Sequence, residues 1–271
     1  MNGKLRRESM ALIQDDLRFH LRIRNGDVGR YVILPGDPGR VPKIAELLDG
    51  AVQVAQNREY NIYTGSLLGE KVSVCSTGIG GPSAAIAVEE LIMSGSDTFI
   101  RIGTSGGMDM KVYGGDIIVA SGAIRSEGTS REYLPIEYPA VPDFDVMCAL
   151  KQAGDALSSD ENGNRCHVGV VHCKDSFYGE IDPNGVPVSA TLAPAWDAYV
   201  RAGCLTSEME SAALFAVALS RHVRAGAVFT ALWNVERSKA GLPDKVCETS
   251  ERAIKCSVDA IKLLIEKDRN A

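Results

Sequence analysis

The segment GDPGR at residues 36–40 brings together the groups that a bound phosphate needs. Gly36 lets the backbone approach an anion closely because it has no Cβ. A helix that begins after such a turn presents unpaired N–H groups with a partial positive charge. Arg40 adds a planar guanidinium that matches two phosphate oxygens, although alone it is equally well explained as a solvated charge in a first helical turn. The segment therefore predicts an anion site that needs further positive groups.

Arg101 is a second candidate for that site, because it lies within an otherwise apolar run beside Gly103 and Thr104. A charge in a buried strand requires a partner, since burying it alone is costly. The structural alternative is a salt bridge. Arg58, in the segment NREY at 57–60, has the character of a surface residue when it is considered alone.

Two further segments suggest contacts to a sugar and to a base. Glu208 and Glu210 straddle the expected start of an alanine-rich helix. They are either favourable charges at a helix N-terminus or carboxylates that accept sugar hydroxyls. Phe177 and Tyr178 follow a strand, and they either stack on a base or pack in the core.

Two other patterns fail as sites. The glycine turn at 77–83 lacks the third glycine of a dinucleotide fingerprint, so no nicotinamide or flavin cofactor is expected. Cysteines and histidines at 166–173 alternate between the two faces of a strand, so they cannot converge on a metal. We expect no cofactor and no metal.

The elements that must position these residues alternate along the chain. Short β-branched runs predict strands and periodic apolar patterns predict helices. The expected strands are 31–34, 71–76, 98–103, 116–123, 168–173 and 225–232, and the expected helices are 41–48, 83–93, 145–157, 210–222 and 244–267. This order predicts an α/β fold with three α/β/α layers and a mixed, largely parallel sheet. Glycine-rich turns follow three of the strands, and ligands bind at such strand ends.

Composition limits the partners. With 271 residues, the chain can form one large domain or two small ones. Its net charge of −6 does not favour nucleic acid or a membrane as a partner. Seven cysteines at scattered spacings, without an apolar signal segment, indicate a reduced, cytoplasmic protein.

Taken together, these segments resemble the hexameric nucleoside phosphorylase family, and within it the uridine-cleaving members most closely. The matching pieces are GDPGR at 36–40, NREY at 57–60, CSTGIGGPSAAIAVEEL at 75–91, RIGTSGG at 101–107, YPAVPDFDV at 138–146, DSFY at 175–178 and EMESAALF at 208–215. The resemblance implies a single domain over 1–271, with 1–28 at a subunit interface. It also implies phosphorolysis of a nucleoside, uridine being favoured, to the free base and ribose 1-phosphate, with inorganic phosphate as co-substrate.

The resemblance also assigns roles to residues. Phosphate would be bound by Gly36, Arg40, Arg101 and Thr104, joined by Arg58 from a neighbouring subunit. Ribose would be bound by Thr104, Glu208, Met209 and Glu210, with His20 reaching the 5′-hydroxyl across the interface, and the base would meet Ser105, Gly106, Phe177, Glu180 and Arg237. Arg101 and Glu210 would be the catalytic residues. Sites shared in this way imply a homo-oligomer, with a dimer as the smallest active unit and a hexamer as the assembly.

The chain departs from the family pattern around the base. Glu180 and Asp182 stand where uridine-cleaving members have glutamine and arginine, and Asn234 stands where purine-cleaving members have an aspartate. Arg237 is a candidate cation for the leaving base. Three alternatives stay open: a purine nucleoside phosphorylase of the same fold, a nucleosidase that uses water, and a non-catalytic nucleoside-binding protein.

Overall fold

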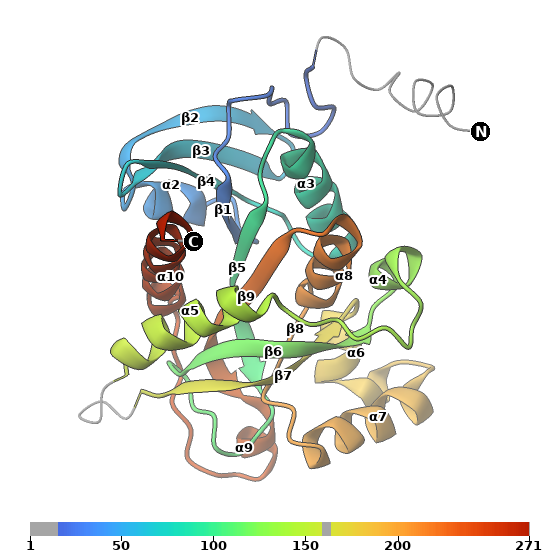
Figure 1. Ribbon diagram of the computed structural model, residues 1–271. Helices are drawn as coiled ribbons and strands as arrows, with labels where there is room; N and C mark the ends of the chain where they lie inside the picture. The colour runs from blue at the N-terminus through green and yellow to red at the C-terminus, as the bar shows by residue number, and fades with distance from the viewer. Residues whose placement is uncertain (1–15, 159–163, 271) are drawn as a thin grey trace.

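The computed structural model describes residues 16–158 and 164–270, so part of the predicted interface segment 1–28 lies outside the described residues. Within them, nine strands form one sheet in the order β2-β3-β4-β1-β5-β8-β7-β6-β9 (Figure 1). The strands are β1 (Tyr31–Pro35), β2 (Asp49–Asn57), β3 (Tyr60–Leu67), β4 (Glu70–Cys75), β5 (Thr98–Gly107), β6 (Ile117–Ser126), β7 (Cys166–Lys174), β8 (Thr206–Glu208) and β9 (Arg224–Asn234). Parallel pairings slightly outnumber antiparallel ones, which confirms the predicted mixed α/β sheet.

Helices cover both faces of this sheet (Figure 1). They are α2 (Arg40–Ala45), α3 (Gly81–Met93), α4 (Thr129–Tyr133), α5 (Phe144–Ala156), α6 (Phe177–Ile181), α7 (Ser189–Arg201), α8 (Ser211–Arg221), α9 (Val235–Lys239) and α10 (Glu251–Arg269), with a 3₁₀ turn at Pro183–Gly185. In Figure 1, α5 and α10 lie on one side of β5 and β9, and α3 and α8 lie on the other. The predicted three-layer arrangement is therefore present.

Part of the sheet closes on itself, which the sequence did not predict. Strand β5 pairs with β8 and also with β9, β8 pairs with β7, β7 with β6, and β6 returns to β9. These five strands form a ring of pairings, and β1 joins it through β5. Strand β5 therefore pairs with three strands, β1, β8 and β9, and it forms the centre of the fold.

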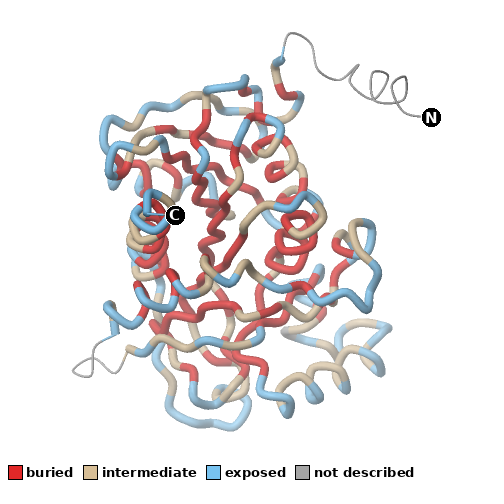
Figure 2. Tube along the Cα trace, in the orientation of Figure 1, coloured by how far each residue is buried: buried red, intermediate tan, exposed pale blue. Residues whose placement is uncertain are grey.

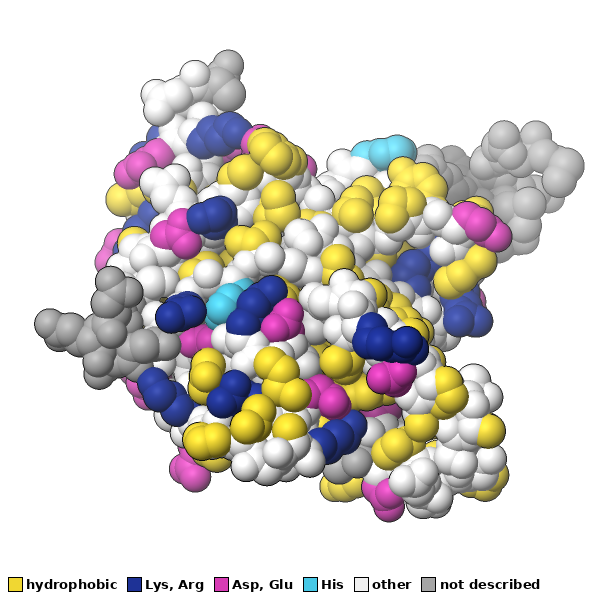
Figure 3. All heavy atoms as spheres, turned by 90° about the horizontal axis from the view of Figure 1, so that it is seen from below, with side chains coloured by type: hydrophobic (Ala, Val, Ile, Leu, Met, Phe, Trp, Pro, Cys, Tyr) yellow, Lys and Arg dark blue, Asp and Glu magenta, His cyan; other side chains and the backbone are white. Residues whose placement is uncertain are grey.

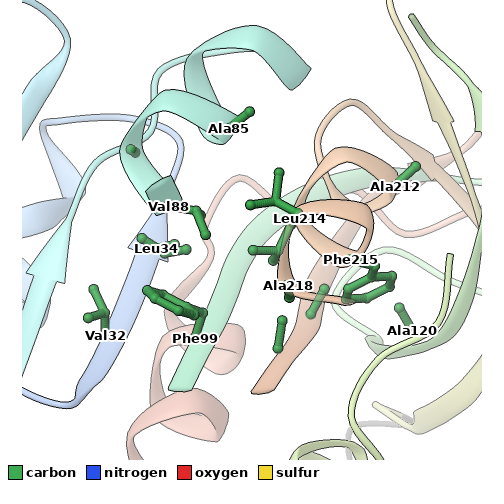
Figure 4. Packing of buried hydrophobic residues seen from close by; sticks show 14 of the residues in the cluster. Val32, Leu34, Ala85, Val88, Phe99, Ala120, Ala212, Leu214, Phe215 and Ala218 are labelled. Carbon is green, nitrogen blue, oxygen red and sulfur yellow. The ribbon is translucent and has the colours of Figure 1, made fainter. Parts of the chain in front are cut away.

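Buried side chains fill two layers, one on each side of the central strands (Figure 2). In one layer, Phe99 of β5 packs near Val88 of α3 and close to Leu34 of β1, while Phe215 of α8 lies toward Ala120 of β6 (Figure 4). The other layer holds the apolar faces of α2, α5 and α10. By contrast, α7 contains no buried residue and lies at the margin of the molecule.

Two predicted boundaries are wrong. The residues 104–107, expected as a turn, are strand, because β9 pairs along β5 as far as Gly107 and β8 pairs with its last two residues. The C-terminal helix begins at Glu251 and not near residue 244. The Asp244 carboxylate accepts a hydrogen bond from the Asn234 N–H at 2.6 Å, and the Cys247 N–H donates to the Leu232 carbonyl at 2.8 Å. These contacts keep the segment that precedes Glu251 outside the helix.

Basic and acidic side chains are interspersed over the face of the molecule shown in Figure 3, in keeping with the modest net charge of −6. Within residues 16–158 and 164–270, no helix combines the length and the apolar character needed to cross a membrane.

The carboxylate of Asp268 links the C-terminal end of α10 to the sheet through hydrogen bonds. Both of its oxygens accept hydrogen bonds from the Arg224 guanidinium, at 2.9 and 2.6 Å, and one also accepts from the Tyr31 hydroxyl at 2.7 Å. The bonds from Arg224 and Tyr31, with the positive charge of Arg224, lower the pKa of Asp268 to about 2. A lowered pKa means that the folded state favours the ionised form.

Replacing Asp268 with asparagine is therefore expected to reduce thermal stability at pH 7 and to matter less in acid. The contribution of the carboxylate is complete above the unfolded pKa of about 4 and is lost as the pH falls toward about 2. Thermal unfolding at pH 7, 4 and 3 measures this, with Asp259→Asn, on the same helix beside Lys262, as the matched control. A destabilisation of equal size at all three pH values would contradict the account.

Candidate functional site

A cavity of about 810 Å³ opens at the carboxyl ends of β1 and β4 and along the second half of β5. Ligand pockets for small molecules have volumes of this order. Most of the residues proposed from the sequence line it, so segments far apart in the chain meet here. They are Gly36, Arg40, Arg101, Thr104, Ser105, Gly106, Phe177, Glu208, Met209 and Glu210.

Two glycine turns meet at one end of the cavity, which we call the anion end (Gly36, Arg40, Gly78 and Arg101). The Gly78 N–H donates to the Gly36 carbonyl at 3.0 Å, so the turns after β1 and β4 are bonded to each other. Gly78 has φ +67°, and a Cβ there would lie 2.8 Å from Cγ of Glu59. Only glycine fits this position without strain, which explains the need for a glycine in this turn.

Arg101 lies at the anion end with its guanidinium buried between two carboxylates. It is 6 % exposed, its Nε donates to Glu208 at 3.2 Å, and its Nη2 pairs with Glu210. The third nitrogen, Nη1, is buried and has no hydrogen-bond partner among the described residues. A Cβ on Gly36 would lie 3.9 Å from this nitrogen, so Nη1 faces the first glycine turn. A buried donor without a partner is costly, and it indicates a position where a ligand oxygen binds.

Backbone N–H groups hold both glutamate carboxylates, that of Glu208 at the start of α8 and that of Glu210 at the glycine turn before α3. Glu208 accepts from the N–H of Glu210 at 2.9 Å and from that of Ser211 at 3.0 Å, while Glu210 accepts from the Gly80 N–H at 2.7 Å. Glu208 thus stabilises the start of α8, which is the first alternative from the sequence, and it also lines the cavity. Contact between Glu208 and a sugar hydroxyl stays a prediction. Glu210 connects α8 to the glycine turn that precedes α3.

Burial and charge act differently on the groups of this cluster. Burial opposes the charge of Arg101, but the carboxylates of Glu210 and Glu208 outweigh it and raise the pKa of Arg101. Burial also raises the pKa of Glu208, yet the Arg101 charge and the hydrogen bonds from Ser211 lower it overall. For Glu210, burial and the negative charge of Glu208 together raise the pKa above its ordinary value. The surroundings of Arg101 therefore favour the ionised form of Glu208 more than that of Glu210.

Arg40 adds a second guanidinium to the anion end. The residue is half-buried, and its guanidinium makes no hydrogen bond to the part of the chain that the structure describes. Burial, assisted by the charge of Arg101, lowers its pKa. Two like charges in one partly buried place repel each other, and an anion between them would relieve that repulsion.

His20 and Arg58 do not line this cavity within the described chain. The His20 ring lies 2.7 Å from Oε1 of Glu90 on α3, and Arg58 is exposed on the turn between β2 and β3, with φ +54°. Both remain predictions for a site that a neighbouring subunit completes.

Arg237 has structural contacts outside the cavity. Its guanidinium donates to the carbonyls of Pro243 and Met110 at 2.6 to 2.8 Å and lies 4.1 Å from the centre of the Tyr113 ring. Asn234 is buried, and its amide donates to the carbonyls of Asp109 and Val112 while its oxygen caps α9. Neither residue lines the cavity in the described chain, so these contacts give no support to Arg237 as the cation at the base.

The opposite end of the cavity leads into a small side lobe of about 40 Å³, which we call the base lobe. Glu180, proposed from the sequence, lines this lobe, and Phe177 lines both the lobe and the main cavity. Sequence reasoning missed Lys174, Trp196 and Trp233, which also line it. The feature of the sequence that could have identified Lys174 is its position at the end of the β-branched run that forms β7.

The two cysteines of β7 pack on different sides of the sheet, as the strand pattern predicted. Cys173 packs in the layer of α8, and Cys166 packs against the layer of α5 and α10. Across residues 16–158 and 164–270, no group of three or more His, Cys, Asp or Glu side chains is placed to hold a metal ion.

Comparison with known proteins agrees with this geometry. Residues 30–266 match the family model described as the phosphorylase superfamily. A uridine phosphorylase of Treponema pallidum is 50% identical over 93% of this chain and 96% of its own length. A guanosine phosphorylase of Halorubrum lacusprofundi is 42% identical over 90% of this chain and 98% of its own, and a uridine phosphorylase of Escherichia coli is 36% identical over 91% and 98%. The chain therefore belongs to the phosphorylase superfamily.

Proposed function

We propose that the protein splits uridine with inorganic phosphate into uracil and ribose 1-phosphate, which makes it a pentosyltransferase. The observation that carries the proposal is the buried Nη1 of Arg101, a donor without a partner that faces the Gly36 turn. Relatives named uridine phosphorylase, matched over nearly their whole length, support the reaction and the base.

In this proposal the anion end binds phosphate. Arg101 and Arg40 supply guanidinium N–H groups, and the turn at Gly36 brings backbone close to the anion. Thr104 lies three residues beyond Arg101 on β5 and adds a hydroxyl to the same wall. Arginine suits this task because its fork matches two oxygens of one phosphate.

The ribose then lies between the anion end and the base lobe. Glu210 projects into the cavity from the start of α8, and its carboxylate is fixed by Gly80 and Arg101. Such a carboxylate accepts hydrogen bonds from two adjacent sugar hydroxyls, and Met209 beside it offers an apolar surface to the sugar ring. The arrangement holds C1′ at a fixed position relative to the phosphate.

The reaction needs no covalent intermediate with the enzyme. The C1′–N1 bond breaks with its electron pair on the base, the sugar gains oxocarbenium character, and a phosphate oxygen bonds to C1′ from the opposite face. The proton that HPO4²⁻ gives up balances the proton that the base gains. Binding orients the two reactants, and fixed charges stabilise the charge that develops between them.

We also propose a homo-oligomer in which a dimer is the smallest active unit, with a hexamer as the full assembly. The positions of His20 and Arg58 outside the cavity of their own chain support this, because both are available to a neighbouring subunit. All seven cysteines are free thiols, which supports a reducing compartment such as the cytoplasm.

A substrate panel tests the proposed function. Purified protein is incubated with uridine, thymidine, inosine, guanosine and adenosine, with and without phosphate, and release of the base is measured. We expect cleavage that requires phosphate and is fastest with uridine. Cleavage without phosphate would identify a nucleosidase, preference for inosine or guanosine would identify a purine enzyme, and binding without cleavage of any nucleoside would identify a binding protein.

A further inference from the structure

A buried lysine, Lys174, lies where the base of a bound nucleoside would be. It is the last residue of β7 and only 7% exposed, and it lines both the main cavity and the base lobe. Its ammonium donates to the Ser207 hydroxyl on the neighbouring strand β8. A lysine is rarely buried without a partner or a function, because desolvation disfavours its charge.

The partner of Lys174 is Glu180 of the short helix α6. Oε2 of Glu180 lies 3.7 Å from the Lys174 ammonium, too far for a good hydrogen bond, and it has no hydrogen-bond partner among the described residues. The same oxygen lies 3.3 Å from Nδ1 of His172, a ring that is 98% buried. The lobe therefore holds an ammonium and a carboxylate side by side, and each can form further hydrogen bonds with a ligand.

The walls of the lobe are apolar and aromatic. Phe177 has its ring 6.0 Å from the Lys174 ammonium, and Trp196 meets His172 edge to face at 6.1 Å. Trp233 closes the lobe from the end of β9. The side chains of Lys174 and Glu180 are themselves largely buried, so their interactions with a ligand are stronger there than in solvent.

The lobe is distant from the anion end along the sheet. Arg101 and Gly106 both lie on β5, and Gly106 lines the lobe. Five strand residues span on the order of 15 Å, which leaves room for a phosphate and a ribose between them. The Lys174 ammonium is therefore in a position to contact the base and not the phosphate.

We propose that Lys174 and Glu180 together read the base and that Lys174 stabilises it as it leaves. This rests on the proposed function. Lys174 donates to a ring carbonyl oxygen, and Glu180 accepts the adjacent ring N–H. Ser207 is a positioning residue that holds the ammonium through its hydroxyl, and the buried His172 ring lies beside the carboxylate.

The pair matches a carbonyl next to an N–H, which is the edge that uracil presents at O2 and N3, or at N3 and O4. Cytosine presents a lone pair at N3, and that lone pair would face the Glu180 carboxylate and be repelled. A base whose polar edge does not match the site binds far more weakly than one that differs only slightly in shape, because the buried polar groups of the site then lose their hydrogen-bond partners. The arrangement thus selects uridine over cytidine.

Lys174 also contributes to the chemical step. When the C1′–N1 bond breaks, the electron pair remains on the base and its negative charge spreads to the carbonyl oxygens. An ammonium already fixed at one of those oxygens stabilises this charge more in the transition state than in the ground state. The base leaves as an anion and then takes up the proton that balances the reaction.

Replacing Lys174 with methionine tests the leaving-group role. We expect kcat/KM for uridine to fall by about 10²–10³-fold, with the KM for phosphate little changed. The loss should be clearly smaller with 5-fluorouridine, because its base is more acidic and needs less stabilisation. Lys151→Met, an exposed lysine on α5, serves as the matched control with unchanged kinetics.

The comparison of the two substrates separates catalysis from structure. A merely structural role for Lys174 would reduce activity equally with uridine and 5-fluorouridine, and that result would overturn the proposal. If the unaltered protein cleaves no nucleoside with phosphate, the proposed function fails, and the two failures are thereby distinguished.

Two measurements test Glu180, and one of them needs no variant. The unaltered protein should cleave 3-methyluridine at least about 10²-fold more slowly than uridine, because the methyl group replaces the N–H that Glu180 accepts. Glu180→Gln should raise the ratio of cytidine to uridine cleavage by about tenfold or more, since an amide can turn a donor toward N3. Equal rates with 3-methyluridine, or an unchanged ratio in Glu180→Gln, would refute the reading of the base by Glu180.

Discussion

Replacing Arg101 with alanine is expected to lower kcat/KM for phosphate by about 10³-fold or more. Among the described residues, Arg101 has the one fully buried guanidinium at the anion end, and its Nη1 group has no hydrogen-bond partner there. Initial rates at fixed uridine and increasing phosphate measure the effect. Uridine binding, followed separately by calorimetry, should weaken much less.

The same substitution leaves Glu208 and Glu210 buried without their cation, so its effect on stability must be separated from its effect on phosphate. Removing one partner of a buried ion pair costs about 3–5 kcal/mol. Arg101→Lys keeps the charge but lacks the fork, and we expect it to restore stability while recovering only part of the phosphate affinity. An unchanged KM for phosphate in a folded Arg101→Ala protein would exclude the proposed role.

Mixing two inactive variants is expected to restore activity if Arg58 serves a neighbouring subunit. Arg58→Ala and Arg101→Ala should each lose most activity. In a mixed dimer, one site then combines an intact Arg101 with an intact Arg58 from the other chain, while the second site lacks both. After random exchange of subunits, about a quarter of all sites would be intact.

This experiment depends on which chain each arginine serves. If Arg58 acted within its own chain, every mixed site would lack one of the two arginines and no activity would return. The measurement is uridine cleavage after the variants are unfolded together and refolded. Mixing Arg58→Ala with itself is the control, and it should remain inactive. The exposed position of Arg58 outside its own cavity motivates the expectation.

Much of the site was predictable because its residues lie in turns that follow buried strands. The pattern at 31–34 predicted β1, and the GDPGR segment after it predicted the anion end, where Gly36 and Arg40 are indeed found. Arg101 was recognisable because a charge within an apolar strand needs a partner. Local sequence carries these signals, since strand, turn and charge are neighbours in the chain.

Other features depend on contacts between distant segments, and the sequence alone did not reveal them. Strand β8 has only three residues, and it forms because β5 and β7 lie on either side of it. Helix α7 was not predicted, because its interior holds Pro194 and its short sequence carries no strong helix-start signal; it contains no buried residue. Lys174 followed by an aspartate resembles a solvated charge, and only the packing of α6 and α7 over β7 encloses it.

The closed ring of strands and the glycine turn after β1 carry the residues of the anion end and its two glutamates. Arg101 and Glu208 lie on strands of the ring, Glu210 lies two residues beyond β8, and Arg40 begins α2. Glu180, Phe177 and Trp196 lie instead on α6 and α7, a marginal segment whose second helix buries nothing. The base lobe is therefore built from two kinds of element, because Lys174 and Trp233 lie on strands of the ring while Glu180 and Trp196 lie on the outer helices. A substitution in α6 or α7 would change one wall of the base lobe and leave the strand-borne residues that bind phosphate in place.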